Sequence, residues 1–134
     1  QWTFEQGAQV VVVIGSDAPE LTIRWLQDAF EALGRRDVVL GPAVDGGYHL
    51  IGLSRPRPEL FAGMPWSSGT LLTQTLARVQ GLNLAVQCLD AVADLDTPAA
   101  LTAYLQRLET SRRRTHTARY LRTRFGLSAD RRAQ

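Results

Sequence analysis

The stretch "VLGPAVDGGYHLIGL" (residues 39–53) carries the strongest structural signal in the sequence. Two apolar runs, each of a length typical of a strand, flank the compact segment "PAVDGG". A plain hairpin needs only two turn residues, so this connection is longer than a tight turn requires. Asp45 is followed by Gly46 and Gly47, and Tyr48 and His49 come directly after them. The segment therefore predicts two strands and raises the question of what Asp45 does between them.

Strands and helices alternate on both sides of this stretch. The apolar patterns predict strands at residues 9–15, 37–41, 48–53 and 82–89. They predict helices at residues 19–33, 69–79, 98–108 and 115–125. Such alternation is typical of an α/β fold. We expect a three-layer sandwich with a mixed, mostly parallel sheet.

Length and composition narrow the class of protein. The chain has 134 residues, 45% of them hydrophobic, which is enough for one domain with a core. No apolar run reaches the length of a membrane span. The single Cys88 excludes an internal disulfide, and its apolar neighbours predict a buried thiol in a cytoplasmic protein. Because the chain begins with Gln1 rather than Met, we expect that the true start is missing.

Charge divides the chain into an acidic body and a basic tail. Residues 112–134 hold eight Arg and one acid, whereas residues 1–111 hold seven Arg and twelve acids. We predict a domain at residues 1–110 and a basic helical tail at residues 111–134, docked on the body or on a partner through Tyr120, Leu121 and Phe125. Nucleic-acid binding is not favoured, because the tail has two aromatics and no recognised motif.

Two aspartates follow predicted strands, where α/β proteins bind ligands. Asp17 follows "VVVVIGS", and Asp96 follows the last strand after a short loop. Together they could hold Mg²⁺ or Mn²⁺ through carboxylate oxygens. Each also has a structural interpretation, because "DAPE" and "DTPA" both resemble helix N-caps. Spacing alone leaves both interpretations open.

The other candidate residues also have two interpretations. Gly46 and Gly47 could admit a ligand close to the backbone, or they could only form a turn. Trp66 could stack on a sugar or base, or it could belong to the core. Ser67 and Ser68 are expected to cap the following helix. His49 lies in an apolar strand and is expected to be structural.

Four motifs in order carry a family resemblance: "VVVIGSDAPEL", "DVVLGPAVDGGYHLIGL", "LFAGMPWSSGTLL" and "ADLDTPAAL". Together they resemble a bacterial family of GT-A-like glycosyltransferases, formerly a domain of unknown function. That family belongs to the nucleotide-diphospho-sugar transferase superfamily and is more remotely similar to phospholactate guanylyltransferase. The resemblance covers residues 10 to about 101 and implies a partial GT-A-like fold.

The resemblance also implies roles for individual residues. Asp17 and Asp96 match metal-binding aspartates, and Asp94 would support these ligands or replace one. The "DGGY" segment (residues 45–48) matches the loop that shapes the donor or acceptor pocket, so Gly46, Gly47 and Tyr48 are candidate substrate-binding residues. Trp66 and Ser67 match the rim of that pocket. Asp45 is the candidate that positions or deprotonates the acceptor.

These features lead to three hypotheses about function. The first is a metal-dependent glycosyltransferase that uses a nucleotide-sugar donor and an unknown acceptor. The second is a nucleotidyltransferase similar to phospholactate guanylyltransferase. The third is a non-catalytic binding or assembly module, because the family's opening βαβ unit, which holds the nucleotide, has no counterpart here. An open sheet edge would also favour a homo-oligomer.

Overall fold

The computed structural model describes residues 1–111 and 113–127 of the chain. These residues form two compact units, one spanning residues 1–94 and the other beginning at residue 95. Each unit is described by itself. Of the predicted basic tail, residue 112 and residues 128–134 lie outside the described residues.

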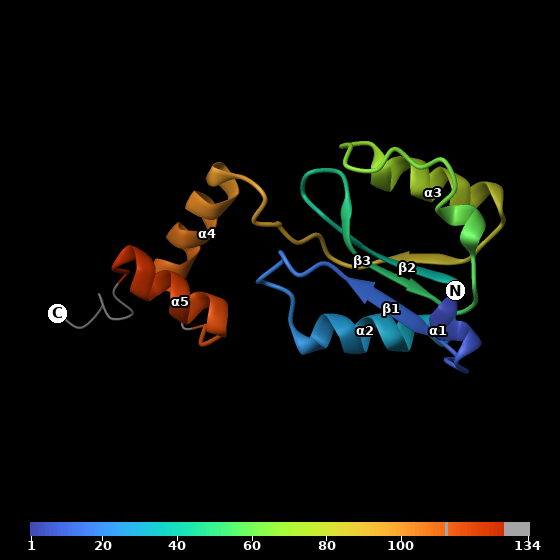
Figure 1. Ribbon diagram of the computed structural model, residues 1–134, viewed down its shortest axis with the longest axis horizontal. Helices are drawn as coiled ribbons and strands as arrows, with labels where there is room; N and C mark the ends of the chain where they lie inside the picture. Colours follow the sequence, from blue (N-terminus) through green and yellow to red (C-terminus); the bar gives the residue numbers. More distant parts are fainter. Residues whose placement is uncertain (112, 128–134) are drawn as a thin grey trace. The chain divides into compact units, whose positions relative to one another are not determined.

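The first unit is built on a four-stranded sheet (Figure 1). Its strands are β1 (Val11–Ile14), β2 (Val38–Pro42), β3 (Tyr48–Leu53) and β4 (Val86–Cys88). Their order in the sheet is β1-β3-β2-β4. Strand β3 runs antiparallel to both β1 and β2, whereas β2 and β4 are parallel. The prediction of a mixed sheet is therefore confirmed.

Three of the four strands, β1, β2 and β4, run in the same direction, and β3 runs against them. The connection between β2 and β3 is too short for a crossover, so these strands pair antiparallel. Strand β3 lies between β1 and β2 and is antiparallel to β1 as well, so two of the three strand pairings among the described residues are antiparallel. The sequence showed the elements but not that β3 inserts between two earlier strands.

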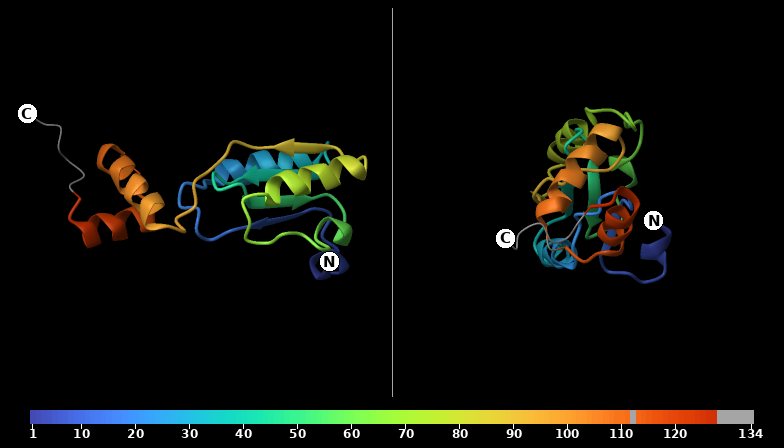
Figure 2. Two further views of the ribbon diagram at one scale, coloured as in Figure 1. Left: turned by 90° about the horizontal axis from the view of Figure 1, so that it is seen from above. Right: turned by 90° about the vertical axis from the view of Figure 1, so that its left-hand side faces the viewer.

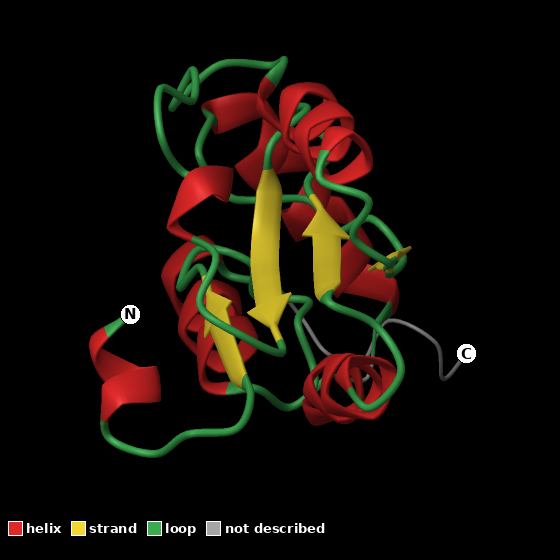
Figure 3. Ribbon diagram, turned by 90° about the vertical axis from the view of Figure 1, so that its right-hand side faces the viewer, coloured by secondary structure: helices red, strands yellow, loops and turns green. Residues whose placement is uncertain are grey.

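Helices cover both faces of this sheet (Figures 1 and 3). Helix α2 (Ile23–Leu33) packs on one face, where Ala29 and Leu33 join Val39 and Leu50 in a buried cluster. Helix α3 (Leu71–Gly81) and the short helix η1 (Pro58–Leu60) cover the other face. There the buried residues are Val38, Leu40, Ile51, Leu53, Leu60 and Val79. Because successive side chains of a strand point to opposite faces of the sheet, the same strands contribute to two separate cores.

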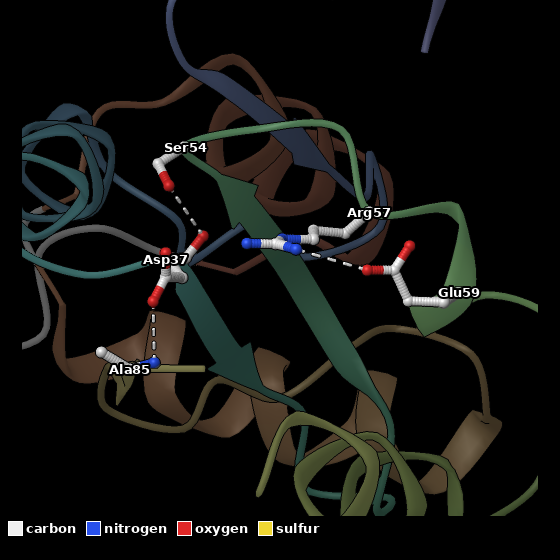
Figure 4. A network of polar contacts seen from close by, with 5 residues as sticks. All are labelled: Asp37, Ser54, Arg57, Glu59 and Ala85. Atoms are coloured by element: carbon white, nitrogen blue, oxygen red, sulfur yellow. Dashed lines mark hydrogen bonds and ion pairs between the residues drawn. The ribbon is translucent and has the colours of Figure 1, made fainter. Parts of the chain in front are cut away.

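A polar network ties the strand ends together at the side of the sheet where β2 begins (Figure 4). The Asp37 carboxylate accepts a hydrogen bond from the Ala85 backbone N–H at 2.9 Å. The Ser54 hydroxyl donates to the Asp37 backbone carbonyl at 3.4 Å. Nearby, Arg57 and Glu59 form an ion pair at 3.5 Å. The Asp37 bonds join the segment before β4 and the end of β3 to the start of β2.

The two edge strands of the sheet, β1 and β4, carry exposed side chains. On β1 the side chains of Val13 and Ile14 are 59% and 46% exposed. On β4 the Cys88 thiol is exposed, so the prediction that it is buried is wrong. Strand β4 is a short end strand, and this position leaves its side chains less covered than those of β2. Assembly into a homo-oligomer stays a prediction.

The second unit is a pair of helices, α4 (Pro98–Thr110) and α5 (His116–Phe125), which contact each other (Figure 2). Tyr104 and Leu108 of α4 form its core with Ala118 and Leu121 of α5. Because α4 packs on α5, the unit begins near residue 95, whereas the charge pattern placed a boundary near residue 110.

Helix α1 (Trp2–Glu5) completes the described helices. Within the described residues, we find no helix that combines the length and apolar character needed to cross a membrane.

Candidate functional site

The loop between β2 and β3 folds onto the segment that precedes α3. The Asp45 Oδ1 atom accepts a hydrogen bond from the Gly47 backbone N–H at 2.9 Å. Gly46 has φ of +92°, and a Cβ atom at this residue would lie 2.1 Å from the Gly69 carbonyl oxygen. The Gly46 carbonyl also accepts a hydrogen bond from Leu72 N–H at 2.9 Å. The space beside Gly46 is therefore filled by the chain itself, and ligand binding by Gly46 and Gly47 stays a prediction.

The same loop brings Asp45 close to Asp94. The segment after β4 runs beside the loop, because Val92 N–H donates to the Pro42 carbonyl and Val44 N–H donates to the Val92 carbonyl. A carboxylate oxygen of Asp45 and one of Asp94 lie within 4.8 Å of each other. Asp45 is exposed and Asp94 is half-buried. Two carboxylates at this separation repel each other unless a cation or hydrogen bonds compensate.

Carboxylate oxygens are hard ligands and suit a divalent cation such as Mg²⁺. This acidic cluster has the donor atoms to hold one. Asp96 follows two residues after Asp94, in the second unit. The family resemblance implied that Asp94 would support Asp17 and Asp96 or replace one of them as a ligand. The segment after β4 pairs with the loop between β2 and β3. Neither the "DGGY" motif nor the "ADLDTPAAL" motif indicates this pairing, so the sequence did not predict that Asp45 and Asp94 meet.

The structure decides against helix capping for both predicted metal ligands. Helix α2 begins at Ile23 with Thr22 as its N-cap, so Asp17 lies outside the helix. At α4 the N-cap is Thr97, whose Oγ1 accepts a hydrogen bond from Ala100 N–H at 3.1 Å. Neither Asp17 nor Asp96 therefore has the capping role that would explain it without a ligand.

Asp17 occupies a different place from Asp45. It is exposed in the loop after β1, and its carboxylate lies over Gly15, where a Cβ atom would come within 2.7 Å of Oδ1. Among the described residues it does not complete a group of three with Asp45 and Asp94. The metal-binding roles of Asp17 and Asp96 stay predictions.

His49 is a buried residue of β3. It is 4% exposed, and within the described residues neither of its ring nitrogens has a hydrogen-bond partner. Its ring lies against Gly41, where a Cβ atom would come within 2.8 Å of it. Burial lowers the pKa of His49, and the Asp17 carboxylate acts in the opposite direction. A neutral, packed imidazole agrees with the structural role expected for it.

Trp66 and Ser67 lie on an exposed segment before α3. The Trp66 ring is 53% exposed and stacks on Phe61, with centroids 6.3 Å apart and planes 11° apart. Ser67 has φ of +58°, uncommon for a residue other than glycine. Neither Ser67 nor Ser68 is the N-cap, which is Thr70, so that prediction is wrong. Instead the Ser68 and Thr70 hydroxyls are hydrogen-bonded at 2.9 Å.

Tyr48, another predicted site residue, packs its ring against the core on the α3 face of the sheet. Burial raises the pKa of its hydroxyl, and the nearby Thr75 side chain lowers it by a smaller amount. This position favours a packing role. Substrate binding by Tyr48 stays a prediction.

A mixed α/β sheet with carboxylates beyond the ends of its strands is typical of α/β proteins that bind ligands at that edge of the sheet. Comparison with solved structures supports this class. The chain is similar to a protein from Desulfovibrio desulfuricans G20 described as a "putative nucleotide-diphospho-sugar transferase", with a TM-score of 0.86 and 32% sequence identity over 95% of this chain. The alignment covers 56% of that protein, so this chain spans little more than half the length of its relative.

A family comparison gives the closer assignment. Residues 1–68 match the family described as "Uncharacterized protein conserved in bacteria (DUF2064)", and the chain belongs to this family. No curated protein matches the chain. The expected superfamily is thereby confirmed.

Proposed function

We propose that this chain forms part of a metal-dependent glycosyltransferase that takes a nucleotide sugar as its donor. The observation that carries the proposal is the close approach of Asp45 and Asp94 within a nucleotide-diphospho-sugar transferase fold. The complete three-layer GT-A-like architecture and a cytoplasmic location are part of the same proposal.

Asp45 and Asp94 would hold a divalent cation between the loop and the segment after β4. Asp96 belongs to the second unit, and its metal-binding role stays a prediction from the family resemblance. When bound, such a cation offsets the negative charge of a nucleotide diphosphate. One Asp45 oxygen is already held by the Gly47 N–H, which fixes the carboxylate and leaves its second oxygen for the cation. Asp45 is thus better placed to bind the metal than to act as a base.

Asp17 has a separate part in this proposal. The family resemblance implies a metal-binding role for Asp17, but because Asp17 does not join the Asp45–Asp94 group, we assign it to binding of the donor from the loop after β1. Trp66 is half exposed and would stack on the sugar or base of the donor at the rim, beside Ser67. An exposed aromatic ring with one face already against Phe61 is held in place for such stacking.

Titration with Mn²⁺, followed by the electron paramagnetic resonance of the free ion, tests the metal site. We expect Asp45→Asn and Asp94→Asn each to weaken Mn²⁺ binding at least about tenfold, which corresponds to about 1.4 kcal/mol. Asp28→Asn is the matched control, because Asp28 is an exposed carboxylate on α2 remote from the loop in sequence. Equal loss in the control, or no binding by the unmodified chain, would contradict the proposed site.

A second measurement concerns the donor. Calorimetric titration with a nucleoside diphosphate in the presence and absence of Mn²⁺ should show binding that depends on the metal and weakens in Asp17→Asn. If the protein instead released pyrophosphate from a nucleoside triphosphate, it would be a nucleotidyltransferase and the glycosyltransferase proposal would be wrong.

A further inference from the structure

The second unit carries a concentration of positive charge. Residues 113–127 contain five Arg and no acid. In contrast, residues 1–94 contain six Arg and ten acids. Clustered arginines on one element are the electrostatic feature by which proteins bind phosphate backbones. The charge alone does not choose a partner, but the arrangement of the side chains adds to it.

One arginine, Arg122, binds backbone carbonyls of the same unit. The Arg122 guanidinium donates hydrogen bonds to the carbonyls of Leu108, Ser111 and Arg113, at 3.1, 2.5 and 2.6 Å. These carbonyls belong to the end of α4 and the connection that follows it, so Arg122 fixes the connection against α5. It also lines a cavity of 380 Å³ whose other lining residues are Arg114, Arg119, Thr123 and Leu127.

Arg114 and Arg119 remain available at this cavity. Both are exposed, and within the described residues neither guanidinium group forms a hydrogen bond or an ion pair. Two guanidinium groups beside one cavity match the charge and the hydrogen-bonding needs of a phosphate group.

Two aromatic side chains of the same helix are exposed, Tyr120 on the side away from α4 and Phe125 at the end of the helix. Tyr120 is 66% exposed and Phe125 is 46% exposed. The Arg124 guanidinium lies 5.7 Å from the centroid of the Phe125 ring. Within the second unit Leu121 is buried against α4, and docking of Tyr120 and Phe125 on the first unit or on a partner stays a prediction. Exposed rings among arginines form the kind of surface on which unpaired bases stack.

We propose that the exposed surface defined by Arg114, which precedes α5, and by Arg119, Tyr120 and Arg124 of α5 binds single-stranded nucleic acid. Arg114 and Arg119 bind phosphates, and the Tyr120 ring stacks on a base. A lipid membrane fits less well, because the apolar side of α5 is already buried against α4 through Ala118 and Leu121. This function is independent of the proposed transferase site and reverses the expectation from sequence.

Fluorescence anisotropy with a labelled single-stranded oligouridylate tests the proposal at two salt concentrations. We expect binding that weakens as salt rises. The double variant Arg114→Gln/Arg119→Gln should bind at least about tenfold more weakly, and its salt slope should fall by about 1.4, because each phosphate contact to a single strand contributes about 0.7. Tyr120→Ala should weaken binding about fivefold or more without changing the slope.

The double variant Arg24→Gln/Arg35→Gln is the matched control. It removes the same charge from exposed positions of α2 in the first unit, and we expect it to leave binding unchanged. Far-UV circular dichroism checks that each variant keeps its helices. Equal weakening in the control, or no binding by the unmodified chain at low salt, overturns the proposal. Binding to vesicles of phosphatidylserine and phosphatidylcholine without binding to the oligonucleotide also overturns it and identifies a membrane surface.

Discussion

The helices of the two units are stabilised in different ways. In the first unit, α2 and α3 have N-caps, Thr22 and Thr70, whose side chains make no capping hydrogen bond. In the second unit, the N-caps of α4 and α5, Thr97 and Thr115, both accept one. Helix α5 also ends at Gly126 in the left-handed conformation that typically closes helices.

The difference follows from how much core each helix can reach. Helices α2 and α3 each lie on a sheet face with its own buried cluster. Helices α4 and α5 have only each other, with four buried residues between them among those described. A short helix with little core depends on its caps and on contacts such as those of Arg122. Local sequence therefore matters more in the second unit, and tertiary packing matters more in the first.

The largest expected effect comes from a substitution that disrupts the small core of the second unit. Tyr104→Ala should cost about 3–5 kcal/mol, because it removes the largest buried side chain of that cluster. Hydrogen exchange should show α4 and α5 losing protection while α2 and α3 keep theirs. Tyr120→Ala, which truncates an exposed ring, is the matched control. Loss of protection in both units would show that the two units do not fold independently.

The next effect concerns tertiary packing in the first unit. Gly46→Ala should destabilise it by about 3 kcal/mol, because positive φ costs about 1 kcal/mol and the new methyl group meets Gly69. Gly63→Ala provides the comparison, since Gly63 also has positive φ but no atom within 4 Å of a Cβ. Thermal denaturation of both variants separates the packing cost from the backbone cost. Equal losses would mean that contact with Gly69 contributes nothing.

Removal of the caps sharpens the comparison directly. Thr97→Ala and Thr115→Ala should each cost about 1 kcal/mol, because each removes a capping hydrogen bond. Thr22→Ala should cost clearly less, since the Thr22 side chain makes no such bond. Urea denaturation with the slope held common measures the three values. If Thr22→Ala cost as much as the others, the proposed difference between the units would be wrong.

The smallest expected effect is a dependence of stability on pH in the first unit. Because burial lowers the pKa of His49 below 6.5, its contribution is fully present above that pH and is lost as pH falls toward the folded-state pKa. His49→Phe should reduce the fall in melting temperature between about pH 7 and pH 5. His116→Phe, at an exposed position of α5, should leave it unchanged. The effect is small because Asp17 offsets part of the burial.

The sequence by itself determined the order and type of the elements. Apolar periodicity placed β3 at the residues observed, and it placed the other long elements to within about four residues. Such patterns are local, because the hydrophobic period of a helix or strand is a property of consecutive residues. The ordered motifs also determined the family, which the match to residues 1–68 confirms.

Tertiary structure alone decided the pairing of the strands and the partners of the site residues. Asp45 meets Asp94 because the segment after β4 pairs with the loop through Val92, across nearly fifty residues of sequence. Gly46 is glycine because Gly69 approaches it, and Tyr120 and Phe125 remain exposed because Leu121 and Ala118 alone fit against α4. These outcomes depend on contacts between distant segments. A local pattern can give each segment its conformation, but it does not contain the identity of its neighbours.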